Sequence, residues 1–323
     1  MTNRDVTITI PLSVTVRLGD VSDGAALAHS AEPLDRAVSR PVSYYSGRLG
    51  YDPTFLAVPV PLPSLTDEQR ANAATIVGAE PGADPTVLPY THFSVVMNRA
   101  RQLAYYTAVN IDGSRIVELR RGVDRWFLDP RIAESEQIGK ELYERNALDR
   151  GHLVRRLDPV WGDDFALADD DTFHFTNCSP QHEKFNQGKD LWQGLENYIY
   201  SQAQVLDRKI TVFTGPVFEA ADPLYKGVRL PLAFWKIVAY CRTDGTLAAA
   251  GYVLEQAGLI QDMLSRDAGF APGTYRIPMA QLNQRTGLDF DYLVGHEPPL
   301  SAAGIERGSD RVPVRADYSN VVV

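Results

Sequence analysis

The chain has 323 residues, of which 44% are hydrophobic and 23% charged, and its formal net charge is −9. This composition is typical of a globular protein, and no apolar run is long enough to cross a bilayer. The acidic balance argues against broad electrostatic binding of nucleic acid but leaves room for a local basic groove. Two cysteines, Cys178 and Cys241, are too few for a disulfide framework and favour a reducing compartment.

The N-terminal quarter is expected to be mostly extended chain. Apolar residues alternate on both sides of Pro11 and predict two strands: Val6, Ile8 and Ile10, then Val14, Val16 and Leu18. No signal peptide is recognisable, so we expect a cytoplasmic protein. Residues 41–90 are rich in Pro, Gly and Tyr and indicate turns, with a short helix from Asp67 to about Val77. Together, residues 1–84 are interpreted as a β-rich extension.

The remaining elements follow from hydrophobic periodicity. Strands are expected at about 93–97 and 103–110, after Asp112–Gly113, over 172–177, and in the runs "KITVFTGPVF", "LAFWKIVAYC" and "GTLAAAGYVL". The clearest helix covers residues 190–206, where one stripe holds Leu191, Trp192, Leu195, Tyr198, Ile199 and Val205. A short helix and a loop precede residue 295, and residues 296–323 are expected to form a poorly ordered tail.

The tetrapeptide "DRGH" at residues 149–152 carries the first chemical signal. His152 titrates near neutral pH and can accept a proton from water. Arg150 offers a planar cationic fork that suits phosphate, and Gly151 is expected to let backbone and substrate come close. The alternatives are a surface histidine in a turn and an ion pair between Arg150 and Asp149.

Six further segments accompany this motif in a fixed order: "DPRI" at 129–132, "TNCSPQ" at 176–181, "FNQG" at 185–188, "WQGLE" at 192–196, "GPVF" at 215–218 and "TGLDF" at 286–290. The set resembles the DNA/RNA non-specific endonucleases, the ββα-metal group that includes the Serratia-type nuclease and mitochondrial endonuclease G. The resemblance covers roughly residues 85–295. It implies an α+β fold with a central antiparallel sheet flanked by helices, and Mg²⁺-dependent hydrolysis of DNA and RNA, with Mn²⁺ as a substitute.

The resemblance also implies roles for individual residues. His152 matches the general base, Arg150 the contact to the scissile phosphate, and Asn186 the direct metal ligand. Glu196 matches the glutamate that orients water at the metal, and Asn177 an asparagine that supports the site. Arg155, Arg156 and Arg131 are candidates for a phosphate-tracking groove. The alternatives are turn residues for the two asparagines, a solvated helix carboxylate for Glu196, and an ordinary solvated face for the arginines.

The sequence departs from the family pattern in two places. The spacing from Asn186 to Glu196 is ten rather than the usual eight, so one continuous helix would place them on different faces. A helix that begins at Leu191, capped by Asp190 with Gln193 completing a capping box, leaves Asn186 in the preceding loop. Four residues after the helix glutamate the family often has an arginine, whereas this chain has Tyr200. That phosphate contact is therefore absent or supplied elsewhere.

Other functions stay open at this stage. His174, Cys178 and His182 are spaced by four, as in a zinc hydrolase, although strand character and Pro180 favour roles in the core or at its rim. A catalytically silent nucleic-acid-binding module of the same fold is a second alternative. The acidic runs at 163–164 and 169–171 are interpreted as a solvated loop.

A nuclease without sequence preference must be restrained wherever a genome is present. We therefore expect an inhibitor or an activating partner, with residues 1–84 as a candidate restraint, and a regulated intracellular effector or toxin. DNA and RNA are the expected substrates, no membrane partner is expected, and a homodimer is left open.

Overall fold

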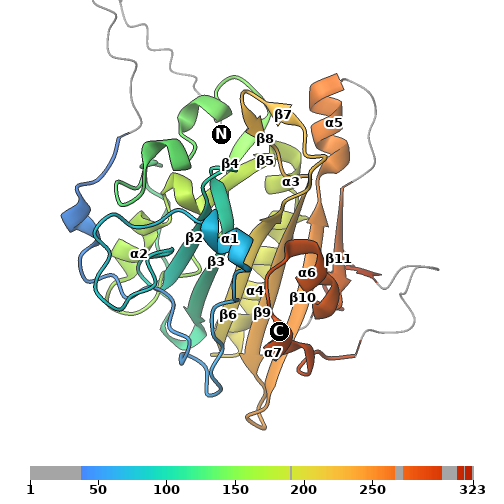
Figure 1. The fold of residues 1–323 in the computed structure, drawn as a ribbon. Coiled ribbons are helices and arrows are strands. Elements are labelled where there is room, and N and C mark those ends of the chain that lie inside the picture. Colours follow the sequence, from blue (N-terminus) through green and yellow to red (C-terminus); the bar gives the residue numbers. More distant parts are fainter. Residues whose placement is uncertain (1–37, 190, 266–271, 300–310, 316, 322–323) are drawn as a thin grey trace, which may run out of the picture. The chain divides into compact units, whose positions relative to one another are not determined.

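An eight-stranded antiparallel sheet runs through the computed structural model, which describes residues 38–189, 191–265, 272–299, 311–315 and 317–321 (Figure 1). In spatial order its strands are β1 (Val87–Pro89), β2 (Phe93–Asn98), β3 (Leu103–Asp112), β6 (Lys209–Val217), β9 (Ala233–Cys241), β10 (Leu247–Glu255), β11 (Gly273–Ile277) and β12 (Val312–Pro313). Two hairpins stand apart from it: β4 (Leu148–His152) with β5 (Cys178–His182), and β7 (Leu224–Tyr225) with β8 (Val228–Arg229). This arrangement is the predicted α+β class with a central antiparallel sheet.

The helices are short apart from one. They are α1 (Asp67–Ala71), α2 (Phe165–Asp171), α3 (Glu183–Asn186), α4 (Trp192–Val205), α5 (Ala257–Ser265), α6 (Met279–Thr286) and α7 (Asp291–Val294). Single 3₁₀ turns cover Val42–Tyr45, Gly113–Arg115, Glu134–Glu136, Lys140–Tyr143 and Phe175–Asn177. Across the described ranges, no helix combines the length and the apolar character that a membrane span requires.

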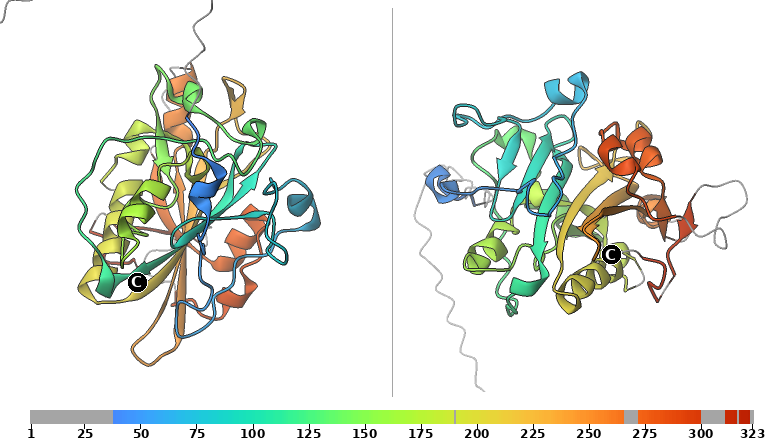
Figure 2. Two further views of the ribbon diagram at one scale, coloured as in Figure 1. Left: turned by 90° about the vertical axis from the view of Figure 1, so that its left-hand side faces the viewer. Right: turned by 90° about the horizontal axis from the view of Figure 1, so that it is seen from below.

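Both faces of the sheet are covered, which explains why its central strands are continuous apolar runs. Along β9, Phe234 and Val238 face one way and pack in the same cluster as Trp192 and Leu195 of α4. Trp235 and Ile237, which alternate with them, face the other way and pack with α6 and α7. Figure 2 shows α4 on one side of the sheet and α6 and α7 on the other. The helix that carries Glu196 is therefore fixed directly on the central strands.

The strongly patterned elements are confirmed, while several polar segments are not. The strands at 93–97 and 103–110, the three long apolar runs and the helix at 190–206 are present, although that helix begins at Trp192. The helix from Asp67 ends already at Ala71, and a 3₁₀ turn replaces the strand expected after Asp112–Gly113. The predicted strand at 172–177 is also wrong.

Asn177 explains that last difference. Its side chain accepts a hydrogen bond from Val154 N at 2.9 Å and donates to the carbonyls of Val154 and Thr172 at 3.1 and 3.0 Å. These bonds fold the segment into a 3₁₀ turn, and strand β5 begins only at Cys178.

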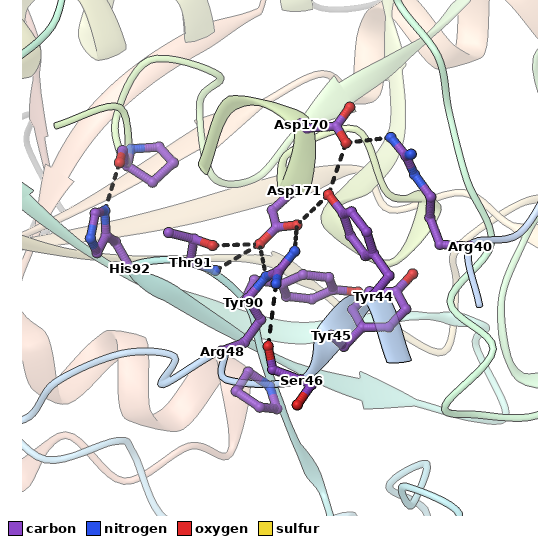
Figure 3. Close-up of polar contacts among 12 residues, drawn as sticks. Arg40, Tyr44, Tyr45, Ser46, Arg48, Tyr90, Thr91, His92, Asp170 and Asp171 are labelled. Atoms are coloured by element: carbon purple, nitrogen blue, oxygen red, sulfur yellow. Dashed lines mark hydrogen bonds and ion pairs between the residues drawn. The ribbon is translucent and has the colours of Figure 1, made fainter. Parts of the chain in front are cut away.

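Residues 38–65 form a strap that is part of the same folded unit. Tyr45, Tyr51, Leu56 and Val60 are buried in the two clusters that cover the sheet. In Figure 3 the fully buried Asp171 carboxylate is surrounded by donors, with Arg48 Nε at 2.9 Å and Thr91 Oγ1 at 2.7 Å. The strap is thereby tied to the end of α2 by charge-assisted hydrogen bonds.

Neither of two expected domain boundaries coincides with an end of the compact unit. The compact unit begins at Ala37, so position 84 does not separate two bodies, because the strap contributes side chains to the common core. The tail is anchored as well, since β12 pairs with β11 and Val321 is buried in the cluster that holds α4. The two strands expected around Pro11 lie outside the described residues.

Candidate active site

The β4–β5 hairpin presents the "DRGH" motif. Side chains two residues apart on a strand share a face, so Arg150 and His152 point to the same side. The indole of Trp126 covers both, with its ring centroid 4.8 Å from that of His152 and 5.2 Å from the guanidinium carbon of Arg150. The ion pair between Arg150 and Asp149 is not formed, because neighbouring residues of a strand face opposite ways.

A pocket of about 810 Å³ opens beside this hairpin. His152, Asn186 and Glu196 all line it, although they come from β4, α3 and α4. Its cationic side chains are Arg121, Arg150, Arg155 and Arg156, against the acidic Asp124, Asp149 and Glu196. The wall is therefore locally basic within an acidic protein, as binding of a phosphodiester requires.

Asp149, the first residue of the motif, orients Asn186. The Asn186 amide nitrogen donates to Asp149 Oδ2 at 2.9 Å, and Gln187 Nε2 donates to the same oxygen at 2.8 Å. A carboxylate only accepts hydrogen bonds, so the amide nitrogen must face it. The amide oxygen Oδ1 of Asn186 is then directed away from Asp149 and is available to a ligand.

Asn186 and Glu196 lie on two separate helices and not on one continuous helix. Asn186 is the last residue of α3, and α4 starts at Trp192 with Leu191 as its cap; the predicted cap Asp190 lies outside the described residues. The Lys189 carbonyl packs against Gly194, where an added Cβ would come within 1.7 Å of that oxygen. Gly194 thus allows the Lys189 backbone to pack against α4, while Asn186 and Glu196 line one pocket.

His152 is neutral at physiological pH. Its Nε2 is buried and makes no hydrogen bond within the described chain. Burial lowers the pKa of His152 to about 3, and the positive charges of Arg121, Arg156 and Arg150 act in the same direction. A neutral imidazole with an unpaired nitrogen is ready to accept a proton.

Glu196 is a buried carboxyl that lines the same pocket. Burial raises the pKa of Glu196 to about 7, an effect that the nearby Lys236 opposes and Asp158 reinforces. Its Oε1 lies 3.5 Å from the Nζ of Lys236. The alternative interpretation of Glu196 as a solvated helix carboxylate is therefore wrong.

Arg155 lies over the position where the family pattern has its helix arginine. Its guanidinium stacks on the ring of Tyr200 at 4.5 Å, and its Nη2 donates to Asn197 Oδ1 at 2.8 Å. Its Nη1 is buried without a hydrogen bond, 3.8 Å from Asp158. Arg156, in contrast, is held by Asp169 at 2.6 Å and by the Leu119 carbonyl.

Arg131 does not belong to the pocket, so its predicted place in the phosphate groove is wrong. Its guanidinium is buried, bonded to the Asp129 carboxylate at 2.7 Å and to the Pro89 carbonyl at 2.7 Å.

Asn177 acts through the backbone turn described above and does not line the pocket either. The space over Gly151 is taken by the Gln181 side chain, 2.1 Å from an added Cβ, and not by substrate.

The zinc alternative does not fit the geometry. Both ring nitrogens of His174 are engaged, with the Tyr45 hydroxyl at 2.7 Å and the Asp171 carbonyl at 2.9 Å. Burial raises the pKa of the Cys178 thiol to about 12, whereas a zinc ligand must be a thiolate. His182 accepts a hydrogen bond from the Lys184 amide, and no set of three or more His, Cys, Asp or Glu side chains in the described residues could hold a metal.

The acidic run at 169–171 is not a solvated loop. It forms the end of α2, and its carboxylates pair with Arg156, Arg40 and Arg48 respectively.

Three residues of the site were not identified from the sequence: Trp126, Asp149 as the partner of Asn186, and Lys236. The sequence could have indicated Lys236, because it is a single charged residue in an apolar strand and a buried charge requires a partner. No sequence pattern indicated Trp126, since it lies in an irregular segment.

The sequence profile of the DNA/RNA non-specific endonucleases matches residues 70–295. The chain belongs to this family. The EndoG chain in the crystal structure of the EndoG/EndoGI complex has a similar fold, with a TM-score of 0.50 and 19% identity over 67% of this chain and 89% of that chain. The ββα-metal nuclease fold expected from the motifs is confirmed.

Two relatives extend the comparison. The relative named "uncharacterized protein y4fB", of Sinorhizobium fredii (strain NBRC 101917 / NGR234), is 43% identical over 270 residues, which is 78% of this chain and 40% of the relative. A salivary endonuclease of Lutzomyia longipalpis is 32% identical over 103 residues, 29% of this chain and 24% of that protein. The chain thus spans less than half the length of either relative.

Proposed function

We propose that the protein is a divalent-metal-dependent endonuclease that hydrolyses phosphodiester bonds in DNA and RNA with little sequence preference. The observation that supports this most directly is the single basic pocket that holds His152, Asn186 and Glu196 together. The chemistry needs a base for water, positive charge around the phosphate and stabilisation of the leaving oxygen. A silent binding module would not need an unpaired histidine nitrogen and an available amide oxygen in the lining of one pocket.

In this proposal the chain's own groups have distinct tasks. His152 takes the proton from the attacking water through its unpaired Nε2. Arg150 and Arg155 bind the phosphate oxygens, because both line the pocket and the described residues give Arg155 only a long ion pair, 3.8 Å from Asp158. The phosphate anion neutralises part of the positive charge of the surrounding arginines, so the proton affinity of His152 rises when substrate binds.

The residues present fit a magnesium ion. Asn186 Oδ1 and the Glu196 carboxylate, which line the same pocket, would provide oxygen atoms, and Mg²⁺ binds few protein oxygens and keeps most of its own water. Mn²⁺ fits the same donors. When bound there, the cation supplies charge neutralisation at the phosphate.

Replacing Asn186 with alanine is expected to raise the Mg²⁺ concentration for half-maximal cleavage by about 10²-fold, since a ligand is lost. Gln187→Ala is the matched control, because Gln187 donates to the same Asp149 oxygen but offers no second role in the proposal. Initial rates over a Mg²⁺ titration measure both. Equal Mg²⁺ dependence for Asn186→Ala and wild type would remove Asn186 from the metal site.

Arg155→Ala is expected to lower kcat/KM by about 10²-fold, as for loss of one transition-state contact. Adding Tyr200→Arg should restore at least a tenth of the lost activity, because position 200 lies one helical turn from Glu196 and under the Arg155 guanidinium. Cleavage kinetics of the single and double variants test this. Failure of the second substitution to restore any activity would show that Arg155 does not contact phosphate from this position.

The substrate range can be tested with supercoiled plasmid, single-stranded DNA and RNA. All three should be cut, and the rates should fall as salt rises, because the contacts are to phosphate. A sharp recognition sequence in the products would contradict the proposal.

We further propose that the protein is a restrained effector or toxin that acts in the cytoplasm. A nuclease that cuts DNA and RNA with little sequence preference needs control. A structural neighbour, EndoG, is described in complex with EndoGI in a study of its inhibition. Expression of the full chain in bacterial cytoplasm tests this. Free nuclease activity without toxicity would contradict it.

A further inference from the structure

The C-terminal segment, residues 311–315 and 317–321, lies beyond the region that the family profile matches. It is nevertheless built into the fold. Strand β12 pairs with β11, and Val321 is buried in the cluster that holds Trp192 of α4. The family pattern therefore does not explain why this segment returns to the helix that carries Glu196.

Tyr318 brings the C-terminal segment onto the loop between α3 and α4, residues 187–191. Its hydroxyl donates to the Lys189 carbonyl at 2.5 Å, and its ring stacks on that of Tyr198 in α4, with the centroids 5.6 Å apart. The Lys189 oxygen and the Tyr318 hydroxyl oxygen both occupy the space that a Cβ at position 194 would need, so this position requires glycine. The hydrogen bond joins residues that are 129 positions apart in the sequence.

The α3–α4 loop is also held by bonds of its own backbone. The amides of Leu191 and Gly194 both donate to the Gly188 carbonyl, at 3.1 and 3.3 Å. These bonds fasten the loop to the first turn of α4. The Tyr318 hydroxyl adds a bond that comes from outside both the loop and the helix.

The loop forms part of the pocket at both of its ends. Gln187 at its start and Trp192 directly after it line the pocket, as does Asn186, the last residue of α3. Asp149 holds the Asn186 side-chain amide at 2.9 Å, but this bond directs the amide oxygen into the pocket only while the Asn186 backbone stays in place. The path of the loop sets the place of that backbone.

We propose that Tyr318 is a positioning residue for the metal site, because its hydroxyl fixes the α3–α4 loop and thereby the place of the Asn186 amide oxygen. The inference rests on the proposed function, since it takes Asn186 as a ligand of the cation. Tyr318 does not line the pocket, so it acts through the loop and does not touch substrate. The C-terminal segment thus has a role in the reaction beyond completing the sheet.

The test compares two variants of the full chain. Tyr318→Phe keeps the stacked ring and removes the hydroxyl. Tyr292→Phe is the matched control, because the Tyr292 hydroxyl also donates to a backbone carbonyl distant in sequence, that of Pro61 at 2.7 Å, and Tyr292 lies outside the pocket. Each variant loses one bond from a hydroxyl to a carbonyl, so their thermal unfolding midpoints should be similar.

The first readout is cation binding without substrate. Mn²⁺ titrations followed by electron paramagnetic resonance measure it, with the site identified by its loss in Asn186→Ala. Mn²⁺ should bind about three- to tenfold more weakly to Tyr318→Phe than to wild type, the usual cost of one hydrogen bond. Tyr292→Phe should bind it as wild type does. Equal affinity of Tyr318→Phe and wild type, or equal losses in the two variants, would overturn the inference.

The second readout needs neither metal nor substrate. Amide hydrogen exchange in the metal-free protein reports opening of the loop, because the amides of Leu191 and Gly194 are bonded to the Gly188 carbonyl. Both amides should exchange faster in Tyr318→Phe than in wild type and at the wild-type rate in Tyr292→Phe. Unchanged exchange in Tyr318→Phe would show that its hydroxyl does not fix the loop, and the inference would fail.

Cleavage kinetics separate positioning of the metal site from general destabilisation. Tyr318→Phe should need about three- to tenfold more Mg²⁺ for its half-maximal rate but should reach the wild-type kcat at saturating Mg²⁺. A kcat that stays low at saturating Mg²⁺ would overturn the inference. A wild type that cleaves nothing would contradict the proposed function, whereas Mn²⁺ binding and hydrogen exchange would still decide the role of Tyr318.

Discussion

Replacing His152 with alanine is expected to lower the rate of cleavage by about 10²–10⁴-fold, the usual cost of losing a general base. The fold should persist, because the Nε2 of His152 bonds to nothing in the described chain and its ring neighbours, Trp126 and Phe173, also pack against each other. Since burial holds the pKa of His152 near 3, the loss should be similar from about pH 5 upwards. Plasmid cleavage rates over that pH range measure it.

His296→Ala is the matched control, because His296 lies outside the pocket. It should retain wild-type rates. Circular dichroism and the midpoint of thermal unfolding should agree among the three proteins. Near-normal cleavage by a folded His152→Ala protein would remove His152 from the mechanism.

A chain that begins at residue 85 is expected not to fold. It lacks the large buried side chains of the strap, Tyr45, Tyr51, Leu56 and Val60. Burial of one such side chain contributes about 1.5–3 kcal/mol, whereas the whole stability of a domain is about 5–15 kcal/mol. The deletion would also leave Asp171 buried without Arg48, its ion-pair partner.

A chain that begins at residue 38 is the control and should unfold cooperatively, since residues from 37 onward form one compact unit. Thermal unfolding followed by circular dichroism compares the two. A folded, cooperative chain from residue 85 would show that the strap is dispensable. It would restore the view that residues up to 84 are a separable restraint.

The elements that could be predicted from the sequence are those whose hydrophobic pattern reflects how their side chains are buried. Strands β6, β9 and β10 are buried on both faces, so they appear as continuous apolar runs. Helix α4 shows a stripe whose members Trp192, Leu195 and Ile199 are buried, although Val205 is 74% exposed. The strap was misread because proline and glycine dominate its composition and conceal the few tyrosines that reach the core.

The site was only partly predictable because its geometry comes from contacts distant in sequence. The motifs identified His152, Asn186 and Glu196, but the link between Asp149 and Asn186 joins residues 37 positions apart. Arg131 was assigned to the groove as one of several nearby arginines. Its true partner, Asp129, stands two residues away, and only the fold shows that both are buried.

The central claim is that one pocket carries out metal-dependent hydrolysis of nucleic acid. It is tested most directly by digesting plasmid DNA with wild type and His152→Ala after treatment with EDTA, then restoring Mg²⁺. The account predicts that wild type is inactive in EDTA and cuts once Mg²⁺ is added, while His152→Ala stays inactive throughout. Cutting that continues in EDTA, or a folded His152→Ala protein that cuts as fast as wild type, would contradict it.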